Sequence, residues 1–317
     1  TQKGGIKTIV WTDTLQTGLM IAAVFFSVYY LLKGLNISFL EFIGSSEFAK
    51  YSNVWVTDSL LSRNHFLKSF LGGAFVTICM TGLDQDMMQK NLSCRTLGDA
   101  QKNMLVFSVV LVLVTLFFMV LGALLFTYSN QTGIAVPAMD GSPKTDLLFP
   151  EIALQGELGI AASITFILGL IAAAYSSADS ALTALTTSFC IDFLKIDHKE
   201  KKKQKSLRRV VHIGMSFLLV CVVILFKHVL DRNVIDGLLT VAGYTYGPLL
   251  GLFAFGIFTS YKIKDRYVWW VVVLSVILTA LIANIESDKL GGYILGYELL
   301  PLNGIFTFLG LILIRRK

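Results

Sequence analysis

A stripe of small polar side chains crosses one long apolar segment of this sequence, Ile160 to Leu194. At about 100° per residue of an α-helix, its members fall within about 120° of one another. They are Ala173, Ser176, Ser177, Ser180, Thr183 and Thr187. A carboxylate, Asp179, lies on the flank of the stripe. Because a carboxylate in hydrocarbon needs a partner, a cavity or an ion, and because neutral oxygens suit a small hard cation, the segment indicates a sodium site. The alternative is that the hydroxyls only allow close helix packing.

A second carboxylate lies near the start of the first apolar segment. Asp13 falls about two turns into the helix that GGIKTIVWTDTLQ predicts, with Gln16 and Thr17 on the same face. A Thr-Asp pair at this position is typical of a helix cap or of a favourable partner for the helix dipole. The other interpretation is that Asp13 meets the polar stripe of the later helix.

The segment from Phe66 to Leu92 predicts a broken helix. Its apolar part, Phe70 to Met80, would cover only about 16 Å, roughly half the hydrocarbon thickness of a bilayer. Thr81-Gly82 can then interrupt the helix, and three polar residues follow: Asp84, Gln85 and Asp86. Broken helices expose backbone polar groups and helix ends to a solute near the membrane midplane. Alternatively, the span ends early and the acidic residues lie at the interface.

Composition places the chain among all-α polytopic membrane proteins, because 55% of its residues are hydrophobic and 15% are charged. Eight apolar runs are candidate spans: Thr8 to Leu32, Phe66 to Leu92, Met104 to Tyr128, Ile160 to Leu194, Val210 to Phe226, Val234 to Phe258, Val268 to Asn284, and Gly304 to Ile314. The four Cys and four His are dispersed, which indicates neither a disulfide framework nor a zinc site. The formal charge of +6 comes from basic residues at helix ends, so nucleic acid is not an expected partner.

The basic residues also predict the orientation in the cell membrane. If the first span starts inside, most of the 27 Lys and Arg residues are cytoplasmic, including the C-terminus and a solvated loop from Lys195 to Arg209. The two long outside loops, Lys33 to His65 and Ser129 to Leu158, are polar enough to hold short surface helices or a lid. The first residues, TQKGGIK, are not a signal peptide, and we expect the chain to be a fragment of a longer protein.

The span Val234 to Phe258 combines Thr240 with the sequence GYTYGP. Gly243, Gly247 and Pro248 inside an apolar run predict a kink or gating bend, because Pro removes a backbone hydrogen bond and Gly loosens the turn. Tyr244 and Tyr246 fit either a cavity lining or ordinary packing.

At these motifs the chain resembles the sodium:solute symporter family of sodium-coupled transporters. GGIKTIVWTDTLQ is similar to the family's Gly-Gly-x-x-Ala-Val-x-Trp-Thr-Asp-x-x-Gln helix, and AAAYSSADSALTALTTSFCIDF is similar to its Ser- and Thr-rich helix that ends in Asp. GLDQDMMQKNLSCRTLGDAQK and DLLFP also fit the family pattern. The likeness covers essentially all 317 residues.

The resemblance implies part of the five-plus-five inverted-repeat fold of the leucine transporter, in one transporter domain over residues 1–317. The first span then corresponds to core helix five, the next five to core helices six to ten, and the last two are accessory. Core helices one to four are absent. By similarity the Ala173 carbonyl with Ser176 and Ser177 forms half of the main sodium site, whose other half lies on core helix one. A second sodium site carries over to Asp13, Ser176 and Ser180, with Asp179 where a hydroxyl residue is usual.

The resemblance implies less about the solute. Asp84 and Asp86 match the polar substrate contact and gating aromatic of sugar-transporting members, and Leu111 matches a sugar-contacting Lys. These departures argue against a specific sugar and suit a cationic or hydroxyl-rich solute. The candidate solute-binding residues are Asp84, Gln85, Asp86 and Thr240.

We therefore expect a sodium-coupled symporter that moves a small polar, sugar-like or other organic solute into the cell by alternating access. Its partners are sodium, the solute and the bilayer. No covalent chemistry is implied, so we do not expect an enzyme. Two alternatives remain open: a proton-coupled carrier of the same fold, in which Asp13 or Asp179 titrates, and a membrane sensor domain of a signalling protein.

Overall fold

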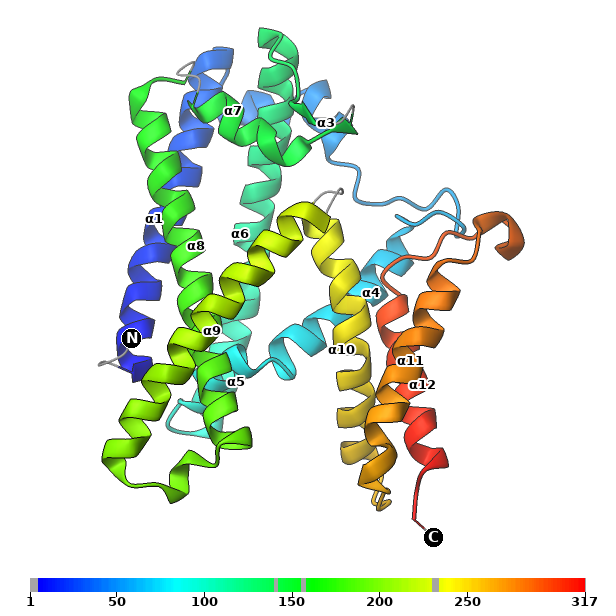
Figure 1. Ribbon diagram of the computed structural model, residues 1–317. Helices are drawn as coiled ribbons and strands as arrows, with labels where there is room; N and C mark the ends of the chain where they lie inside the picture. Colours follow the sequence, from blue (N-terminus) through cyan, green and yellow to red (C-terminus); the bar gives the residue numbers. More distant parts are fainter. Residues whose placement is uncertain (1–4, 140–141, 155–157, 230–233, 317) are drawn as a thin grey trace. The chain divides into compact units, whose positions relative to one another are not determined.

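The computed structural model describes residues 5–139, 142–154, 158–229 and 234–316 (Figure 1). Its α-helices are α1 Gly5–Leu35, α2 Phe39–Ile43, α3 Ser46–Tyr51, α4 Phe66–Gly82, α5 Gln85–Leu92, α6 Leu97–Thr132, α7 Leu148–Leu154, α8 Ile160–Ser188, α9 Lys201–Val229, α10 Val234–Phe258, α11 Val268–Ala283 and α12 Leu299–Leu313. Short 3-10 turns are η1 Thr145–Leu147, η3 Ile196–His198, η4 Asp265–Tyr267 and η5 Ser287–Leu290, and η2 Phe189–Phe193 is a π-helical turn. Among the described residues the only strands are β1 Ala138–Met139 and β2 Ser142–Pro143, which pair antiparallel.

Helices of membrane-spanning length confirm the all-α polytopic class. Six are long and apolar enough in the described part of the chain: Trp11–Leu35, Leu97–Thr132, Ile160–Phe193, Lys201–Phe226, Gly237–Phe258 and Asp265–Ala283. Two shorter apolar helices, α4 and α12, match the remaining predicted spans. A helix pairs all its backbone groups internally, which is what hydrocarbon demands of a spanning segment. The chain is therefore part of a multi-pass membrane protein.

The predicted break in the second span is confirmed. Helix α4 ends at Gly82 and α5 begins at Gln85, with Leu83 and Asp84 between them. Asp84 accepts a hydrogen bond at Oδ1 from the backbone N–H of Met87 at 3.4 Å, and its carbonyl accepts from Met88 at 3.0 Å. Asp84 therefore starts the new helix as its N-cap residue.

The prediction of a loop from Lys195 to Arg209 is wrong. Only its first part, with the turn η3, precedes helix α9, which begins at Lys201. Lys, Gln and Arg are good helix formers, and their long side chains reach water from a helix as well as from a loop. The lysines and arginines of this first part of α9 are exposed, as expected for a solvated segment. The two polar loops do carry short helices, α2 and α3 in one and α7 in the other.

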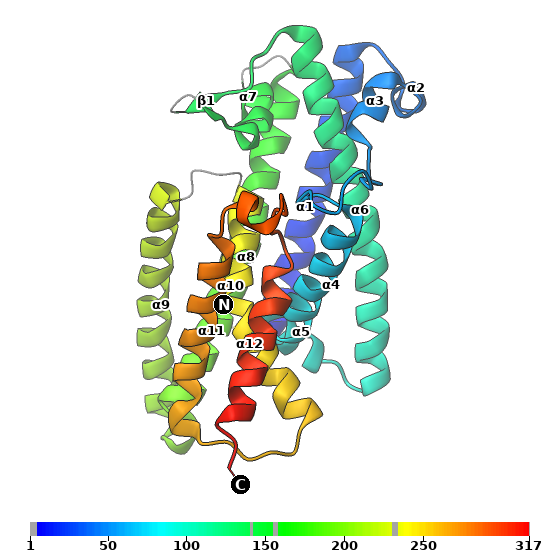
Figure 2. The same ribbon diagram turned by 90° about the vertical axis from the view of Figure 1, so that its right-hand side faces the viewer.

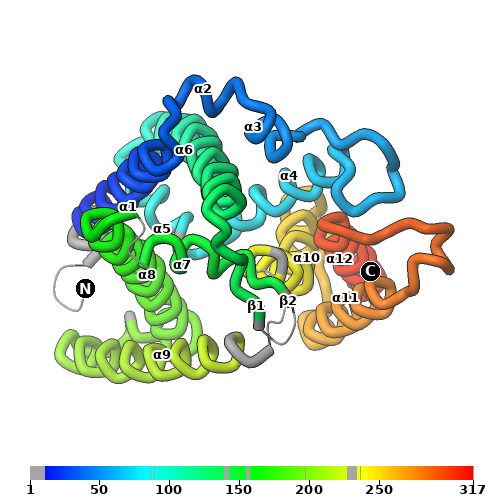
Figure 3. Tube along the Cα trace, turned by 90° about the horizontal axis from the view of Figure 1, so that it is seen from above, coloured from blue at the N-terminus to red at the C-terminus, as the bar shows by residue number. Residues whose placement is uncertain are grey.

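The chain divides into two compact units. The first comprises Thr1–Ser52 with Gln89–Asn233, and the second comprises Asn53–Met88 with Val234–Lys317. In the first unit, α1 packs along α8 (Figure 3). The contact is close because Gly169 of α8 lies against Ala23 of α1, where an added Cβ would come within 2.5 Å of the Ala23 Cβ.

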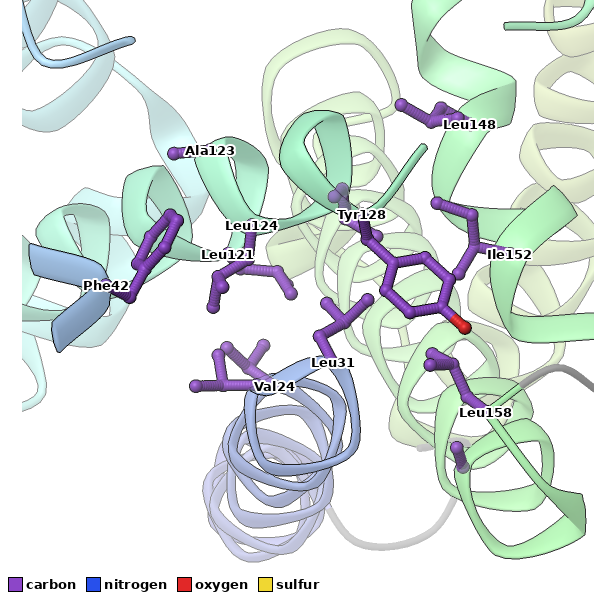
Figure 4. Packing of buried hydrophobic residues seen from close by; sticks show 13 residues of the cluster. Val24, Leu31, Phe42, Leu121, Ala123, Leu124, Tyr128, Leu148, Ile152 and Leu158 are labelled. Carbon is purple, nitrogen blue, oxygen red and sulfur yellow. The ribbon is translucent and has the colours of Figure 1, made fainter. Parts of the chain in front are cut away.

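The main hydrophobic cluster of the first unit joins α1 to α6, α7 and the start of α8 (Figure 4). Leu31 of α1, Leu124 of α6 and Ile152 of α7 are fully buried in it. Tyr128 of α6 lies over Gly34 of α1 and completes the packing. This cluster holds one end of α1 and α8 together, so that the two helices run side by side towards their polar residues.

In the second unit, α12 packs on α10 and α11 (Figure 2). Glycines allow the close approach: an added Cβ at Gly251 of α10 would lie 2.5 Å from the Gly304 carbonyl of α12. Thr307 of α12 donates a buried hydrogen bond of 2.8 Å to Ser275 of α11. Small residues and interhelical hydrogen bonds are the usual means of helix association in membranes.

A kink or gating bend in α10 stays a prediction, and what the structure shows at Pro248 is a hydrogen bond supplied from outside the helix. Pro248 lies inside the continuous helix and has no N–H to give to the Tyr244 carbonyl. The fully buried Asn303 of α12 donates from Nδ2 to the carbonyls of Tyr244 at 3.1 Å and Gly243 at 3.2 Å. Helix α12 thus satisfies the carbonyl that proline leaves without a donor.

Candidate cation site

The carboxylate of the first span meets the polar stripe of the fourth. Ser176 of α8 donates from Oγ to Oδ1 of Asp13 on α1, at 2.8 Å. Asp13 is half-buried, two turns into α1, and the packing of α1 along α8 brings the two residues together. Of the two interpretations of Asp13 from sequence, the structure therefore favours the contact with the stripe over a helix cap.

A lysine lies in the same place. The Nζ of Lys90, from α5, is 3.3 Å from Oδ2 of Asp13 and donates to Oγ of Ser180 at 2.8 Å. Ser180 is 5% exposed, whereas the side chains of Lys90 and Asp13 retain 34% and 21% exposure. An ammonium group has three donors, no acceptor and a positive charge. It therefore contacts these oxygens in the way that a metal cation would.

Sequence reasoning missed Lys90 as a site residue. From sequence, Lys90 is one of the basic residues predicted to be cytoplasmic, because a lysine near the end of a span is usually solvated. One feature of the sequence does indicate such a residue: a carboxylate two turns into a membrane helix is costly and needs a compensating positive charge. Spacing along the chain does not indicate which lysine supplies it, because Asp13 and Lys90 belong to different helices.

The other predicted cation ligands lie on α8 beside this cluster. Ala173 is half-buried and Ser177 is exposed. Their predicted role as sodium ligands is not tested by the structure. Asp179 is half-buried and makes no hydrogen bond or ion pair with any residue that the structure describes. Gln16, one turn after Asp13 on α1, has a buried Oε1 without a hydrogen-bond partner among the described residues. The assignment of Ala173, Ser177 and Asp179 to sodium stays a prediction.

The predicted solute residues are only partly brought together. Asp84 accepts a hydrogen bond of 2.9 Å at Oδ2 from the hydroxyl of Tyr246 on α10, so this carboxylate links the helix break to α10. Gln85 is exposed and Thr240 is half-buried on α10, while the side chain of Asp86 lies outside the described residues. From sequence, Tyr246 fitted either a cavity lining or ordinary packing. In the structure its hydroxyl donates to Asp84 at the helix break. Whether these residues bind a solute stays a prediction.

Comparisons with known proteins agree on one family. A sequence model of the sodium:solute symporter family matches residues 1–265. The sodium/sialic acid symporter SiaT of Proteus mirabilis (strain HI4320) is 25% identical over 300 residues, which are 91% of this chain and 58% of that protein. Sodium-coupled monocarboxylate transporter 1 of Mus musculus is 27% identical over 273 residues, 81% of this chain and 42% of that protein.

A third relative transports a different kind of solute by name. The human sodium/iodide cotransporter is 26% identical over 268 residues, 81% of this chain and 40% of that protein. The chain spans about half the length of the curated relatives that it matches. No solved structure matches it.

Proposed function

Because this chain belongs to the sodium:solute symporter family, we propose that the protein containing it is a sodium-coupled symporter, which moves a small polar solute into the cell by alternating access. Family members are transporters and not enzymes, as the absence of any implied covalent chemistry led us to expect. The observation that carries the proposal is the cluster on α1 and α8, where Asp13 accepts a hydrogen bond from Ser176 and, with Ser180, contacts the ammonium group of Lys90.

The chemistry of this cluster fits sodium. One carboxylate and two hydroxyls are hard oxygen ligands, and Lys90 Nζ marks where positive charge is stabilised between them. In this proposal Ala173, Ser176 and Ser177 supply the α8 half of the main sodium site, and Asp13, Ser176 and Ser180 supply a second site with Asp179 on its flank. Bound sodium would stabilise one arrangement of the helices and thereby shift the population towards the solute-binding state.

The relatives narrow the choice of solute. Their names specify sialic acid, monocarboxylates and iodide, which are all anions at neutral pH. In the described residues both oxygens of Asp84 accept hydrogen bonds, from Tyr246 and from the N–H of Met87, so this carboxylate has a structural role at the helix break. We therefore place small organic anions first among the solutes to test, with neutral sugars second, and treat Gln85, Asp86 and Thr240 as the remaining candidates for contact.

The orientation follows from charge. The exposed lysines and arginines at the start of α9 face the cytoplasm in this proposal, which also places the C-terminus inside. The alternative of proton coupling keeps the same fold and uses Asp13 or Asp179 as the titrating group. A sensor function would require sodium or solute binding without transport, and the same experiments distinguish it.

The test measures thermal stability and uptake of the natural protein that contains this chain, in sodium and in potassium at equal ionic strength. A ligand that binds only the folded state adds about 2.7 kcal/mol at a hundredfold excess over its dissociation constant. We expect sodium-specific stabilisation that is lost in Ser177→Ala and retained in Ser108→Ala, a matched exposed serine on α6.

The uptake measurement then uses proteoliposomes with an imposed sodium gradient and labelled sialic acid, lactate, iodide and glucose. Accumulation that collapses with the sodium gradient supports symport. Equal stabilisation by sodium and potassium, together with uptake that follows a proton gradient alone, contradicts sodium coupling. Sodium-specific stabilisation without uptake of any solute favours the sensor function.

A further inference from the structure

The position that the family resemblance implies for a second sodium ion holds the ammonium group of Lys90. Lys90 Nζ contacts Oδ2 of Asp13 at 3.3 Å and Oγ of Ser180 at 2.8 Å, while Oδ1 of Asp13 accepts from Ser176. All three oxygens belong to the set proposed for that ion. The ammonium group therefore uses the same ligands that sodium would need.

Charge prevents the two cations from sharing these ligands. Lys90 already forms an ion pair with Asp13, the carboxylate of the set proposed for sodium. A sodium ion added between the same oxygens would lie within a few ångströms of the ammonium group. Like charges at such a distance repel strongly in a half-buried environment. Asp179, one residue before Ser180, makes no ion pair with Lys90.

We propose that Lys90 is a tethered cation that competes with sodium for the Asp13 site, so that this protein binds sodium there only when Lys90 leaves. This inference rests on the proposed sodium-coupled function and adds a residue that sets the number of bound ions. Lys90 lies near the end of α5, the short helix that begins at the break after α4. Departure of its ammonium group from Asp13 is therefore a change in the segment that follows the broken helix.

The structure of the lysine side chain suits this role. Its four-carbon stem allows the ammonium group to leave without unfolding α5, and 34% exposure of the side chain gives it a path to water. Serine at position 180 is 5% exposed and stays in place on α8 as a ligand for whichever cation is present. The exchange of one cation for the other keeps Asp13 compensated.

The experiment counts bound sodium in the purified natural protein by equilibrium binding of radioactive sodium, alongside thermal stability in sodium and potassium. Lys90→Met keeps the length of the stem and removes the charge. We expect one additional sodium ion per protein in this variant, with an affinity at the Asp13 site at least about tenfold higher than in wild type. A tenfold change corresponds to a site that Lys90 leaves vacant for about one-tenth of the time. Lys102→Met, an exposed lysine of α6, is the matched control and should bind as wild type does.

A second variant keeps the test valid if Lys90→Met is unstable. The pair Lys90→Met with Asp13→Asn removes both members of this ion pair; it should fold, but should not bind the additional ion. In Lys90→Met itself, sodium and not potassium should restore the stability that the lost ion pair provided. A folded Lys90→Met with unchanged sodium stoichiometry, or an unstable one that sodium does not rescue, overturns the inference.

The pattern of results separates this inference from the proposed function. If only the inference is wrong, wild type still shows a sodium response that Ser177→Ala removes. If sodium binding appears in Lys90→Met but not in wild type, the competition by Lys90 is supported and sodium coupling of the wild-type protein is refuted. If neither protein responds to sodium, both proposals fail.

Discussion

Asn303 on α12 should contribute more to the free energy of unfolding when residue 248 of α10 is proline than when it is a residue with a backbone N–H. The side chain is fully buried, and its Nδ2 donates to the carbonyls of Tyr244 and Gly243. In a regular helix the N–H of residue 248 would donate to the Tyr244 carbonyl, and proline has none. Replacement of Asn303 by Leu keeps a similar branched shape and removes both donated bonds.

The expected loss of stability in Asn303→Leu depends on the backbone carbonyls that lose their hydrogen-bond donor. Hydrogen bonds between membrane helices contribute on average about 0.6 kcal/mol and at most about 1.7 kcal/mol, because the partners find alternatives after unfolding. A buried carbonyl that loses its donor costs about 1–3 kcal/mol. Since the Tyr244 carbonyl has no helical donor to fall back on, we expect Asn303→Leu to lower the free energy of unfolding by about 1–2 kcal/mol.

A double-mutant cycle tests the reasoning directly. Pro248→Ala restores an N–H that can donate to the Tyr244 carbonyl, so Asn303→Leu should cost about 1 kcal/mol less in that background than in wild type. The measurement is the free energy of unfolding of the four proteins in detergent, by denaturant titration with a helical signal. An equal cost of Asn303→Leu in both backgrounds would refute the idea that α12 replaces the bond that proline removes.

Two further predictions concern packing and pH. Gly169→Ala should lower the free energy of unfolding by about 1–3 kcal/mol, because its Cβ would lie 2.5 Å from the Cβ of Ala23. The control is Gly214→Ala, where an added Cβ would meet nothing within 4 Å. It should be neutral or stabilising in the same denaturation assay. Burial and the hydrogen bond to Glu298 raise the pKa of Tyr293 from 10.0 to about 12. Because the folded protein holds this proton more tightly, its contribution to stability is complete below pH 10 and is lost as pH rises through about 12, so melting curves of Tyr293→Phe should decline less over that interval. Retention of the full stability of wild type by Gly169→Ala, or an unchanged alkaline decline in Tyr293→Phe, would contradict these two predictions respectively.

Helical periodicity made the central contact of the site one of two interpretations of Asp13. The hydroxyl stripe of α8 and the cost of Asp13 in a membrane helix together indicate that the two should meet, and Ser176 does bond to Asp13. The bounds of α10 and the break between Gly82 and Gln85 were also within reach, since apolar length and Gly placement determine them. These features depend on local sequence and on the demand of hydrocarbon for paired backbone groups.

The features that sequence did not indicate are those that depend on how separate helices pair. The contact of Asn303 with the Tyr244 carbonyl requires the register of α12 on α10, which apolar composition alone does not specify. The loop predicted at Lys195 to Arg209 failed for another reason, because charge indicates solvation but does not distinguish a helix from a loop. Lys90 combines both difficulties, since its length leaves the position of the charge open and its partners lie on two other helices.

Asp13 connects these observations to the mechanism. A half-buried carboxylate on a membrane helix requires a compensating cation in every conformation that keeps it away from water. Lys90 provides that cation in the structure, and in our proposal sodium is the second source. A state in which Lys90 has left and no sodium has arrived would expose the full cost of the isolated charge, so it should be sparsely populated. In that proposal, exchange between the two cations would link movement of the segment after the helix break to ion binding.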